Sequence, residues 1–286
     1  MKVVKIIIQY ILAVVFALAL LSIILINIAS SRILNESYVL AKLEEENYYE
    51  EVYEEVKSNF EKYIYQSGLD ESVLNDLVSK EKVESDTKLI LNNIYDGLSE
   101  EVSTTSIAEK LDQNIQSSLK GNTYSKQKKA IEQFITKICE EYESTIINSK
   151  INSKVNPIVQ KVIKYLDVVK KALYVVAGIS IVLIIAISIK KIYKILARIG
   201  VALTIDGLLL LISEYYILSK VNIYGITVLG DSVSKVLRVI LIDIFGQITS
   251  CGISLLIIGI LCILMYSIIR AYRRIKRVKE QYTPEN

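Results

Sequence analysis

Four long apolar runs, separated by polar stretches, determine the architecture that the sequence predicts. They cover Ile6–Ile28, Val168–Ile189, Ile195–Ile217 and Ile248–Ile269. Each reaches the length of about 18–20 apolar residues that a helix needs to cross a hydrocarbon core about 30 Å thick. A long polar segment without such a run separates the first two. The pattern therefore predicts four transmembrane helices, with one large polar domain between the first and the second.

The polar segment shows the periodicity of helices and no alternating pattern of strands. Its first helix is expected over 37–66, where apolar residues recur every three or four positions. The residues of this stripe are Tyr49, Val52, Tyr53, Val56, Phe60, Tyr63 and Ile64. Ser67-Gly68 is expected to end the helix. Further helices are expected at about 71–79, 86–97, 106–120 and 125–148, with Asp70, Ser85 and a Ser106/Glu109 capping box at the first three.

Asn156-Pro157 predicts the start of the helix that contains the second span. Asn is favoured as an N-cap and Pro as the first helical residue, because its missing amide would have no partner there. Only Gly178 weakens the helix before Ile189, and membrane helices tolerate glycine. We therefore expect one continuous helix over 157–189, about 50 Å long at a rise of 1.5 Å per residue. It would begin in the polar domain and transmit motion of that domain into the bilayer.

These elements predict an all-α fold, a four-helix transmembrane bundle with a helical extracytoplasmic domain inserted between spans 1 and 2. Asp231–Phe245 is too short and too charged to span, which favours an amphipathic helix on the outer membrane surface. The expected segments are 1–30 (first span), 31–156 (extracytoplasmic domain), 157–189 (continuous helix with the second span), 195–217 (third span), 221–246 (outer loop and amphipathic helix), 248–269 (fourth span) and 270–286 (basic cytoplasmic tail).

Charge is distributed as unevenly as the apolar residues. Segment 31–156 holds 24 acidic and 15 basic residues, whereas the rest of the chain holds 7 acidic and 19 basic residues. Outside segment 31–156, the basic residues are clustered beside alternate ends of the spans. They are Lys2, Lys5, Lys190, Lys191, Lys194 and Arg198, and those from Arg270 to Lys279. The positive-inside rule then predicts a cell-membrane protein with both termini in the cytoplasm and the acidic domain outside.

A cleaved signal peptide is the alternative for the first run, because Ala29-x-Ser31 suits a cleavage site between small residues. Ile6–Ile28 is 23 residues long, and the apolar core of a signal peptide has only about 7–15. We therefore expect this run to stay in the protein as a helix.

Candidate chemistry is sparse. The chain has no histidine, which removes the commonest general base and the usual zinc ligand. Cys139 is the single cysteine of the expected outer domain, so no disulfide can close within it. Seven glutamates between Glu44 and Glu55 could suggest calcium, but a helix points them in several directions, which favours a solvated face. We expect no enzymatic activity, no cofactor, no metal site and no nucleic-acid partner.

Asp206, near the middle of the third span, is the first candidate for a functional residue. A carboxyl group there is costly and should either have a partner or be protonated. With Ser250 and Ser254 it forms a candidate intramembrane polar site. The alternatives are an ion, proton or assembly site, or a neutral carboxyl hydrogen-bonded to one of these serines. The second candidate, for contact with anionic lipid or a partner, is the basic stretch Arg270, Arg273, Arg274, Lys276, Arg277 and Lys279, which topology alone could also explain.

Two resemblances extend these expectations. Leu40–Leu43 through Asn47-Tyr48-Tyr49 to Tyr53, behind a single N-terminal span, resembles uncharacterised four-span membrane proteins of Gram-positive bacteria, which imply no activity. The order of spans is similar to that of cell-division and MacB-type ABC permease subunits, which pass the motion of a cytoplasmic ATPase to an outer domain. Helical sensor domains of bacterial receptors also lie between two spans, but no signalling helix follows here.

The leading hypothesis is a non-enzymatic integral membrane protein of the bacterial cell envelope. Its outer helical domain would bind a protein partner or ligand and would be coupled to the membrane helices in the lipid bilayer. The alternative is a mechanotransmitting, ABC-permease-like or other transport-related subunit, motivated by the order of spans and by Asp206. An enzyme acting on lipid or cell wall would have to work with carboxylates and without histidine. The oligomeric state stays open.

Overall fold

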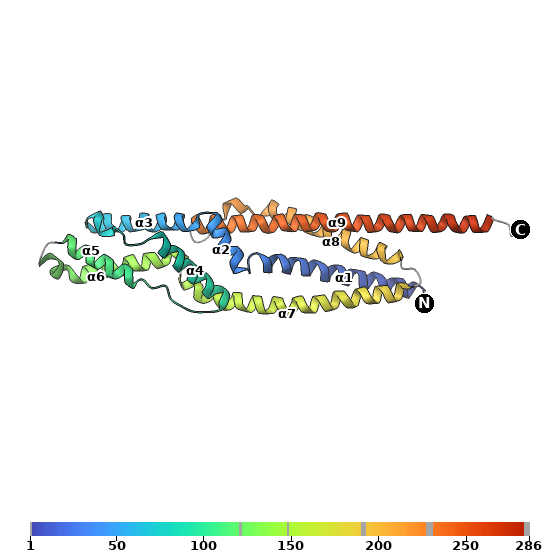
Figure 1. Ribbon diagram of the computed structural model, residues 1–286, viewed down its shortest axis with the longest axis horizontal. Coiled ribbons are helices and arrows are strands. Elements are labelled where there is room, and N and C mark those ends of the chain that lie inside the picture. Colours follow the sequence, from blue (N-terminus) through green and yellow to red (C-terminus); the bar gives the residue numbers. More distant parts are fainter. Residues whose placement is uncertain (1, 120–121, 148, 190–192, 227–230, 283–286) are drawn as a thin grey trace. The chain divides into compact units, whose positions relative to one another are not determined.

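The computed structural model describes residues 2–119, 122–147, 149–189, 193–226 and 231–282, and the regular elements in these ranges are all helical (Figure 1). In chain order they are α1 (Lys2–Ser31), α2 (Glu36–Glu45), α3 (Tyr48–Ser67), η1 (Glu71–Leu74), α4 (Lys80–Asp96), α5 (Thr105–Ser118), α6 (Asn122–Ile147), α7 (Ser149–Ser188), α8 (Tyr193–Lys220), η3 (Ile223–Gly225) and α9 (Asp231–Tyr282). The predicted all-α fold is confirmed for this part of the chain.

Four of the described helices are long and apolar enough to cross a membrane. The helical stretches that meet this criterion are Val4–Ser31, Pro157–Ser188, Tyr193–Lys220 and Asp231–Val278. Each overlaps one of the four apolar runs of the sequence, so the predicted number and order of spans are confirmed. The chain is therefore a multi-pass integral membrane protein.

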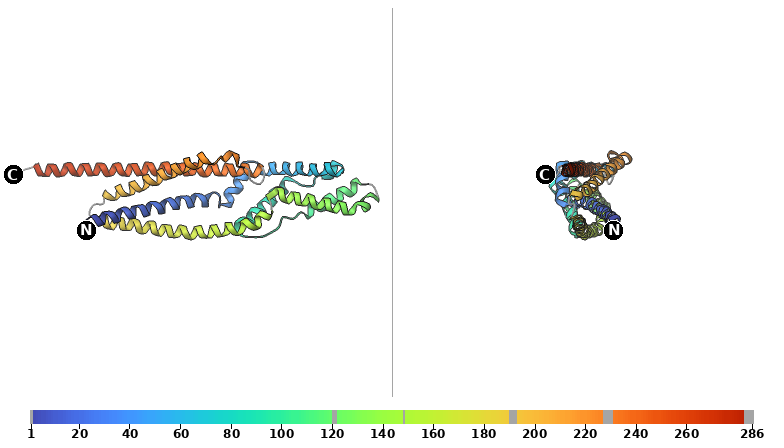
Figure 2. Two further views of the ribbon diagram at one scale, coloured as in Figure 1. Left: turned by 180° about the vertical axis from the view of Figure 1, so that it is seen from behind. Right: turned by 90° about the vertical axis from the view of Figure 1, so that its right-hand side faces the viewer.

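The chain folds as two compact units, which we call the membrane unit and the inserted unit. The membrane unit contains α1, α8 and the parts of α7 and α9 that begin at Lys164 and Leu241. The inserted unit contains α2 to α6, with α7 up to Ile163 and α9 up to Ile240. Figure 2 gives two further views of the helices. The polar segment after the first span thus forms a helical unit, as predicted, and it also includes the start of α9.

The core of the inserted unit forms on the apolar stripe predicted within 37–66. α3 and α5 both contact α6, and in each helix the buried side chains recur every three or four residues, which places them on one face. They are Tyr48, Tyr49, Val52, Val56, Phe60 and Ile64 on α3, Ile107, Leu111 and Ile115 on α5, and Ile138, Tyr142 and Ile146 on α6. Tyr53 and Tyr63 of the predicted stripe are only half-buried.

Helix boundaries in the inserted unit differ from the prediction at polar residues. The helix expected over 37–66 is divided into α2 and α3 at Asn47, whose φ of 55° is left-handed. Asn tolerates this conformation better than most residues. Gly68 ends α3 with a φ of 71°, as predicted. Asp70 caps a helix as predicted, but only the short 3₁₀ turn η1.

The next three helices begin earlier than predicted. Ser79 caps α4, with its Oγ accepting a hydrogen bond from the amide of Lys82, so Ser85 lies inside the helix. α5 begins at Thr105, with Thr104 as its N-cap residue. Ser106 therefore lies in the first turn and is not the N-cap of the predicted capping box. α6 begins at Asn122 and not at Ser125. Ser and Thr suit both caps and first turns, and the residues before each predicted cap continue the helix.

The prediction of a helix start at Asn156-Pro157 was wrong, because α7 begins at Ser149 and contains Pro157 in its interior. A proline there removes one amide donor and costs about 3 kcal/mol in an ordinary helix. The chain on both sides nevertheless continues as one helix. The continuous helix that leads into the second span is longer than expected and ends at Ser188.

The prediction of a short surface helix followed by a separate fourth span was also wrong. α9 is one helix of 52 residues, from Asp231 to Tyr282, and it includes most of the basic tail. No proline interrupts this range, and glycines such as Gly246 are tolerated in a membrane helix. Val236 and Ile240 near its start are buried in the inserted unit, so this part of α9 is not a surface helix.

Small residues bring the membrane helices close together. Ala17 of α1, Ala177 of α7 and Ala202 of α8 belong to one buried cluster, and Ala13 of α1 belongs to another with Ile195 of α8. These small side chains let α1 pack closely against its neighbours.

The backbones of α8 and α9 approach more closely still. A Cβ atom on Gly200 would stand 2.8 Å from the carbonyl oxygen of Gly259, and one on Gly207 would stand 2.7 Å from that of Gly252. A Cβ on Gly259 would lie 2.5 Å from the hydroxyl of Thr204. Two glycines seven residues apart on each helix therefore face each other in antiparallel order. At Gly200, Gly207 and Gly259 no larger residue fits without a shift of the backbone.

Candidate functional site

The carboxyl group of Asp206 lies near the middle of α8 and is completely buried, with 0% of the residue exposed. Neither of its oxygens has a hydrogen-bond partner among the described residues. An ionised carboxylate that is buried without a partner is unfavourable by several kcal/mol. Asp206 is therefore a buried polar group whose hydrogen-bonding capacity the described chain does not use.

The surroundings of Asp206 are tightly packed. One turn before it, Ala202 contacts a cluster that includes Phe16 and Ile23 of α1. The residue after it, Gly207, lies against the backbone of α9 at Gly252. Asp206 thus sits on α8 between the side that meets α1 and the side that meets α9.

The two serines predicted to accompany Asp206 do not reach it. Ser250 and Ser254 on α9 are exposed, and the hydroxyl of Ser254 donates to the carbonyl of Ser250 at 2.8 Å within its own helix. The predicted hydrogen bond to Asp206 is absent, because the glycine face of α9, with Gly252 and Gly259, is the one that meets α8. Of the predicted polar site, Asp206 alone is inside the bundle.

The basic stretch is the exposed C-terminal end of α9. Arg270, Arg273, Arg274, Lys276 and Arg277 are exposed, and the side chain of Lys279 lies outside the described residues. The guanidinium of Arg273 lies 4.6 Å from the ring centroid of Tyr193, which stacks on Tyr266 at 5.9 Å. Aromatic rings with cationic neighbours are typical of the membrane–water boundary.

A second buried polar cluster, which the sequence analysis missed, joins α1, α7 and α8. The side chains of Gln9 and Arg198 both donate to the hydroxyl of Ser188, at 2.9 and 3.2 Å. Arg198 is only 9% exposed, although the sequence analysis counted it among the basic residues beside the ends of the spans. Gln9 inside an otherwise apolar run was the signal that could have indicated this cluster. It ties together the ends of three membrane helices.

The glutamates at the start of α3 are not all solvated, as the sequence analysis had favoured. Lys235 of α9 pairs with Glu51 at 2.6 Å and with Glu46 at 3.7 Å, and Ser232 donates to Glu55 at 3.4 Å. These contacts hold the first turns of α9 in the inserted unit. Among the described residues, no group of three or more possible metal ligands comes together.

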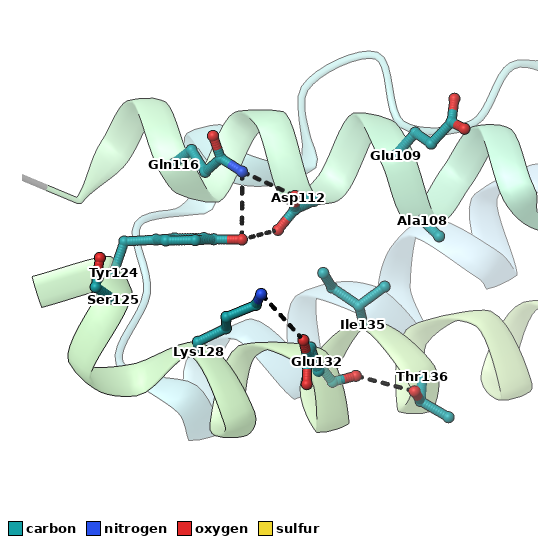
Figure 3. Close-up of a pocket in the computed structure, with 10 residues that line it drawn as sticks. All are labelled: Ala108, Glu109, Asp112, Gln116, Tyr124, Ser125, Lys128, Glu132, Ile135 and Thr136. Atoms are coloured by element: carbon teal, nitrogen blue, oxygen red, sulfur yellow. Dashed lines mark hydrogen bonds and ion pairs between the residues drawn. The ribbon is translucent and has the colours of Figure 1, made fainter.

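A groove between α5 and α6 is an open site of the inserted unit that the sequence analysis did not predict (Figure 3). The hydroxyl of Tyr124 donates to one oxygen of Asp112 at 2.5 Å, and Gln116 donates to the other at 2.9 Å. The bond to Asp112 raises the pKa of Tyr124. On the α6 side, Lys128 lies 3.9 Å from Glu132. The groove has a volume of about 780 Å³.

A buried network joins α4 to α6 in the same unit. The hydroxyl of Tyr142 donates to Asp86 at 2.7 Å, and the ammonium of Lys82 pairs with the same carboxylate oxygen at 3.0 Å. Burial, together with this hydrogen bond, raises the pKa of Tyr142. The three side chains satisfy one another, so we assign the network to stability.

Comparison of the chain with protein-family models, curated proteins and solved structures gives no match. The functional conclusion therefore rests on the geometry described above.

Proposed function

We propose that the protein is a non-enzymatic membrane protein of the bacterial cell envelope whose inserted unit binds a partner outside the membrane. The observation that carries this proposal is the groove between α5 and α6. Its volume of about 780 Å³ is in the range of about 300–1,000 Å³ that small-molecule pockets occupy, so it is large enough to hold a few side chains of a partner. The hydrogen bonds among Asp112, Tyr124 and Gln116 hold its polar side chains in place before any partner arrives.

The charges of the groove favour a particular kind of partner. It is lined by three carboxylates, on Glu109, Asp112 and Glu132, and by one ammonium, on Lys128. Ala108 and Ile135 add apolar surface. A protein segment with basic and hydrogen-bond-donating side chains fits this lining best, because it would offset the excess of negative charge. α7 and α9 contribute residues to both units, which supports coupling of such binding to the membrane helices.

Site-specific photo-crosslinking in intact cells tests the proposal. A photoreactive residue replaces Ser125, which lines the groove, and in a control it replaces Glu101, an exposed residue that does not line it. We expect a crosslinked protein from position 125 alone, and loss of that product when Asp112→Asn and Tyr124→Phe are added. Equal crosslinking from both positions, or an unchanged product in the double variant, would remove the groove as the binding site. Turnover of a ligand by the purified protein would contradict the non-enzymatic function.

Asp206 favours a second candidate function, that of a transport-related subunit. A carboxyl group in the middle of a span, without a partner among the described residues, can bind a proton or a cation. This candidate predicts a sodium or proton flux into proteoliposomes that Asp206→Asn abolishes, or a cytoplasmic ATPase that co-purifies in fixed ratio. If neither is found, the transport function is excluded and partner binding remains.

A further inference from the structure

The membrane unit contains a cavity that neither the sequence nor the proposed function accounts for. It has a volume of about 500 Å³ and lies at the C-terminal end of α1, between α1, α7 and α9. Its lining residues are Ile24, Asn27, Ile28, Ser30, Ser31, Lys170, Gln247 and Cys251.

The polar lining carries one positive charge and no negative charge. Lys170 of α7 forms no ion pair with any described residue, whereas its neighbour Lys171 pairs with Asp167 at 2.6 Å. The amides of Asn27 and Gln247 add neutral hydrogen-bond donors from two other helices. An ammonium surrounded by neutral donors, without a carboxylate, suits an anion with several acceptor oxygens. A phosphate group has this chemistry.

The remaining lining indicates where the phosphate comes from. Ile24, Ile28 and Cys251 give the cavity an apolar side. Lys170 and Gln247 stand at the beginning of the apolar runs Val168–Ile189 and Ile248–Ile269, so the polar side lies at the edge of the hydrocarbon core. Phospholipids present a phosphate and an acyl chain at this depth. A free phosphate would leave the apolar side unused.

We propose that this cavity binds an anionic phospholipid, with its phosphate held by Lys170 and its first acyl carbons against Ile24 and Cys251. The lining offers no carboxylate for the ammonium group of a zwitterionic lipid. Phosphatidylglycerol should therefore bind better than phosphatidylcholine. The site differs from the basic end of α9, since it is built from α1, α7 and the Gln247–Cys251 turn of α9.

Thermal unfolding of the full-length protein tests the proposal in phosphatidylcholine vesicles with increasing phosphatidylglycerol. Lys170→Gln should weaken the apparent affinity for phosphatidylglycerol about five-fold. Lys171→Gln removes the same charge one residue away, outside the cavity, and should leave the affinity unchanged. Equal losses in the two variants would overturn the proposal, because the effect would then be that of general surface charge. Stabilisation by inorganic phosphate alone, as strong as that by the lipid, would overturn the assignment to a lipid.

Cys251 provides a second readout that does not depend on stability. In a background with Cys139→Ser and Cys262→Ser, Cys251 is the single thiol of the chain. Added phosphatidylglycerol should slow its reaction with a maleimide, and Lys170→Gln should remove this protection. Equal protection by phosphatidylcholine, or protection that survives Lys170→Gln, would contradict a phosphate site at Lys170.

Discussion

The inserted unit and the membrane unit each bury an aspartate, but only the aspartate of the inserted unit has hydrogen-bond and ion-pair partners. In the inserted unit, Asp86 accepts from Tyr142 at 2.7 Å and pairs with Lys82 at 3.0 Å. In the membrane unit, Asp206 is 0% exposed and its oxygens meet no hydrogen-bond partner among the described residues. The carboxyl of Asp86 links α4 to α6. The carboxyl of Asp206 has no structural contact that would explain its presence.

The two aspartates differ in what their burial contributes to stability. A carboxyl with a donor and a counter-ion stabilises the packing around it, so its loss is felt in stability. A buried carboxyl without partners contributes no favourable contact, so its loss should not lower stability.

The largest effect is expected from Asp86→Ala. This change leaves the hydroxyl of Tyr142 without its acceptor and Lys82 without its counter-ion, which should lower the free energy of unfolding by about 3 kcal/mol. Hydrogen exchange of the full-length protein in detergent should show faster exchange of the amides in α4 and α6. Asp96→Ala, at an exposed residue of the same helix, is the control and should leave exchange unchanged. A similar response to both variants would mean that the network contributes little.

The next effect concerns the contact between α8 and α9. Gly207→Ala places a Cβ 2.7 Å from the carbonyl oxygen of Gly252, and should destabilise the membrane unit by about 1–3 kcal/mol. Gly178→Ala is the matched control, because a Cβ there meets nothing within 4 Å, and it should be neutral or slightly stabilising. Unfolding by sodium dodecyl sulfate in mixed micelles measures both. If Gly207→Ala is as harmless as Gly178→Ala, the packing beside Asp206 is looser than described.

A smaller effect is expected from pH. Burial and the nearby Glu36 raise the pKa of Tyr95 from 10.0 to about 12, and its hydroxyl donates to the carbonyl of Ile33 at 2.7 Å. Between these pH values the unfolded chain loses a proton that the folded chain keeps. The contribution of Tyr95 is therefore fully present below pH 10 and is lost as the pH rises through about 12, by at most about 1.4 kcal/mol per pH unit.

Tyr95→Phe makes this contribution measurable. The variant should be less stable than the wild type by about 1 kcal/mol at pH 7, because it lacks one hydrogen bond. The gap should close when unfolding is measured at successive pH values above 10. Tyr65→Phe, at a residue that is 91% exposed, serves as the control and should follow the wild type throughout. A gap that stays constant with pH would show that Tyr95 does not keep its proton.

Much of the fold could be predicted because it depends on properties that a sequence states directly. The four spans follow from the length and continuity of apolar runs, and the core face of α3 follows from residues such as Val56 and Phe60 at helical spacing. The residues at which helices begin and end were harder to predict. Pro157 has strong preferences for a helix start, yet the neighbouring residues carry α7 through it. The length of α9 was missed because charge was taken to separate a surface helix from a span.

The candidate site was predictable only as a residue and not as an arrangement. A carboxyl within an apolar run identifies Asp206 from composition alone. Its pairing with Ser250 or Ser254 depended on the rotation of α9, which the close approach of Gly252 and Gly259 to α8 decides. The groove between α5 and α6 and the cavity beside Lys170 likewise depend on which helices become neighbours. No local pattern encodes such contacts.

The stability of Asp206→Asn and Asp206→Leu, measured by unfolding in mixed micelles, shows whether the buried carboxyl of Asp206 has a structural partner. A carboxyl without partners predicts that Asp206→Asn changes the free energy of unfolding by no more than about 0.5 kcal/mol. Asp206→Leu should then be neutral or stabilising, because it replaces an unsatisfied polar group by an apolar one. A loss of more than about 2 kcal/mol in both variants, as expected when a buried pair is broken, would show that Asp206 has a structural partner and would contradict the account.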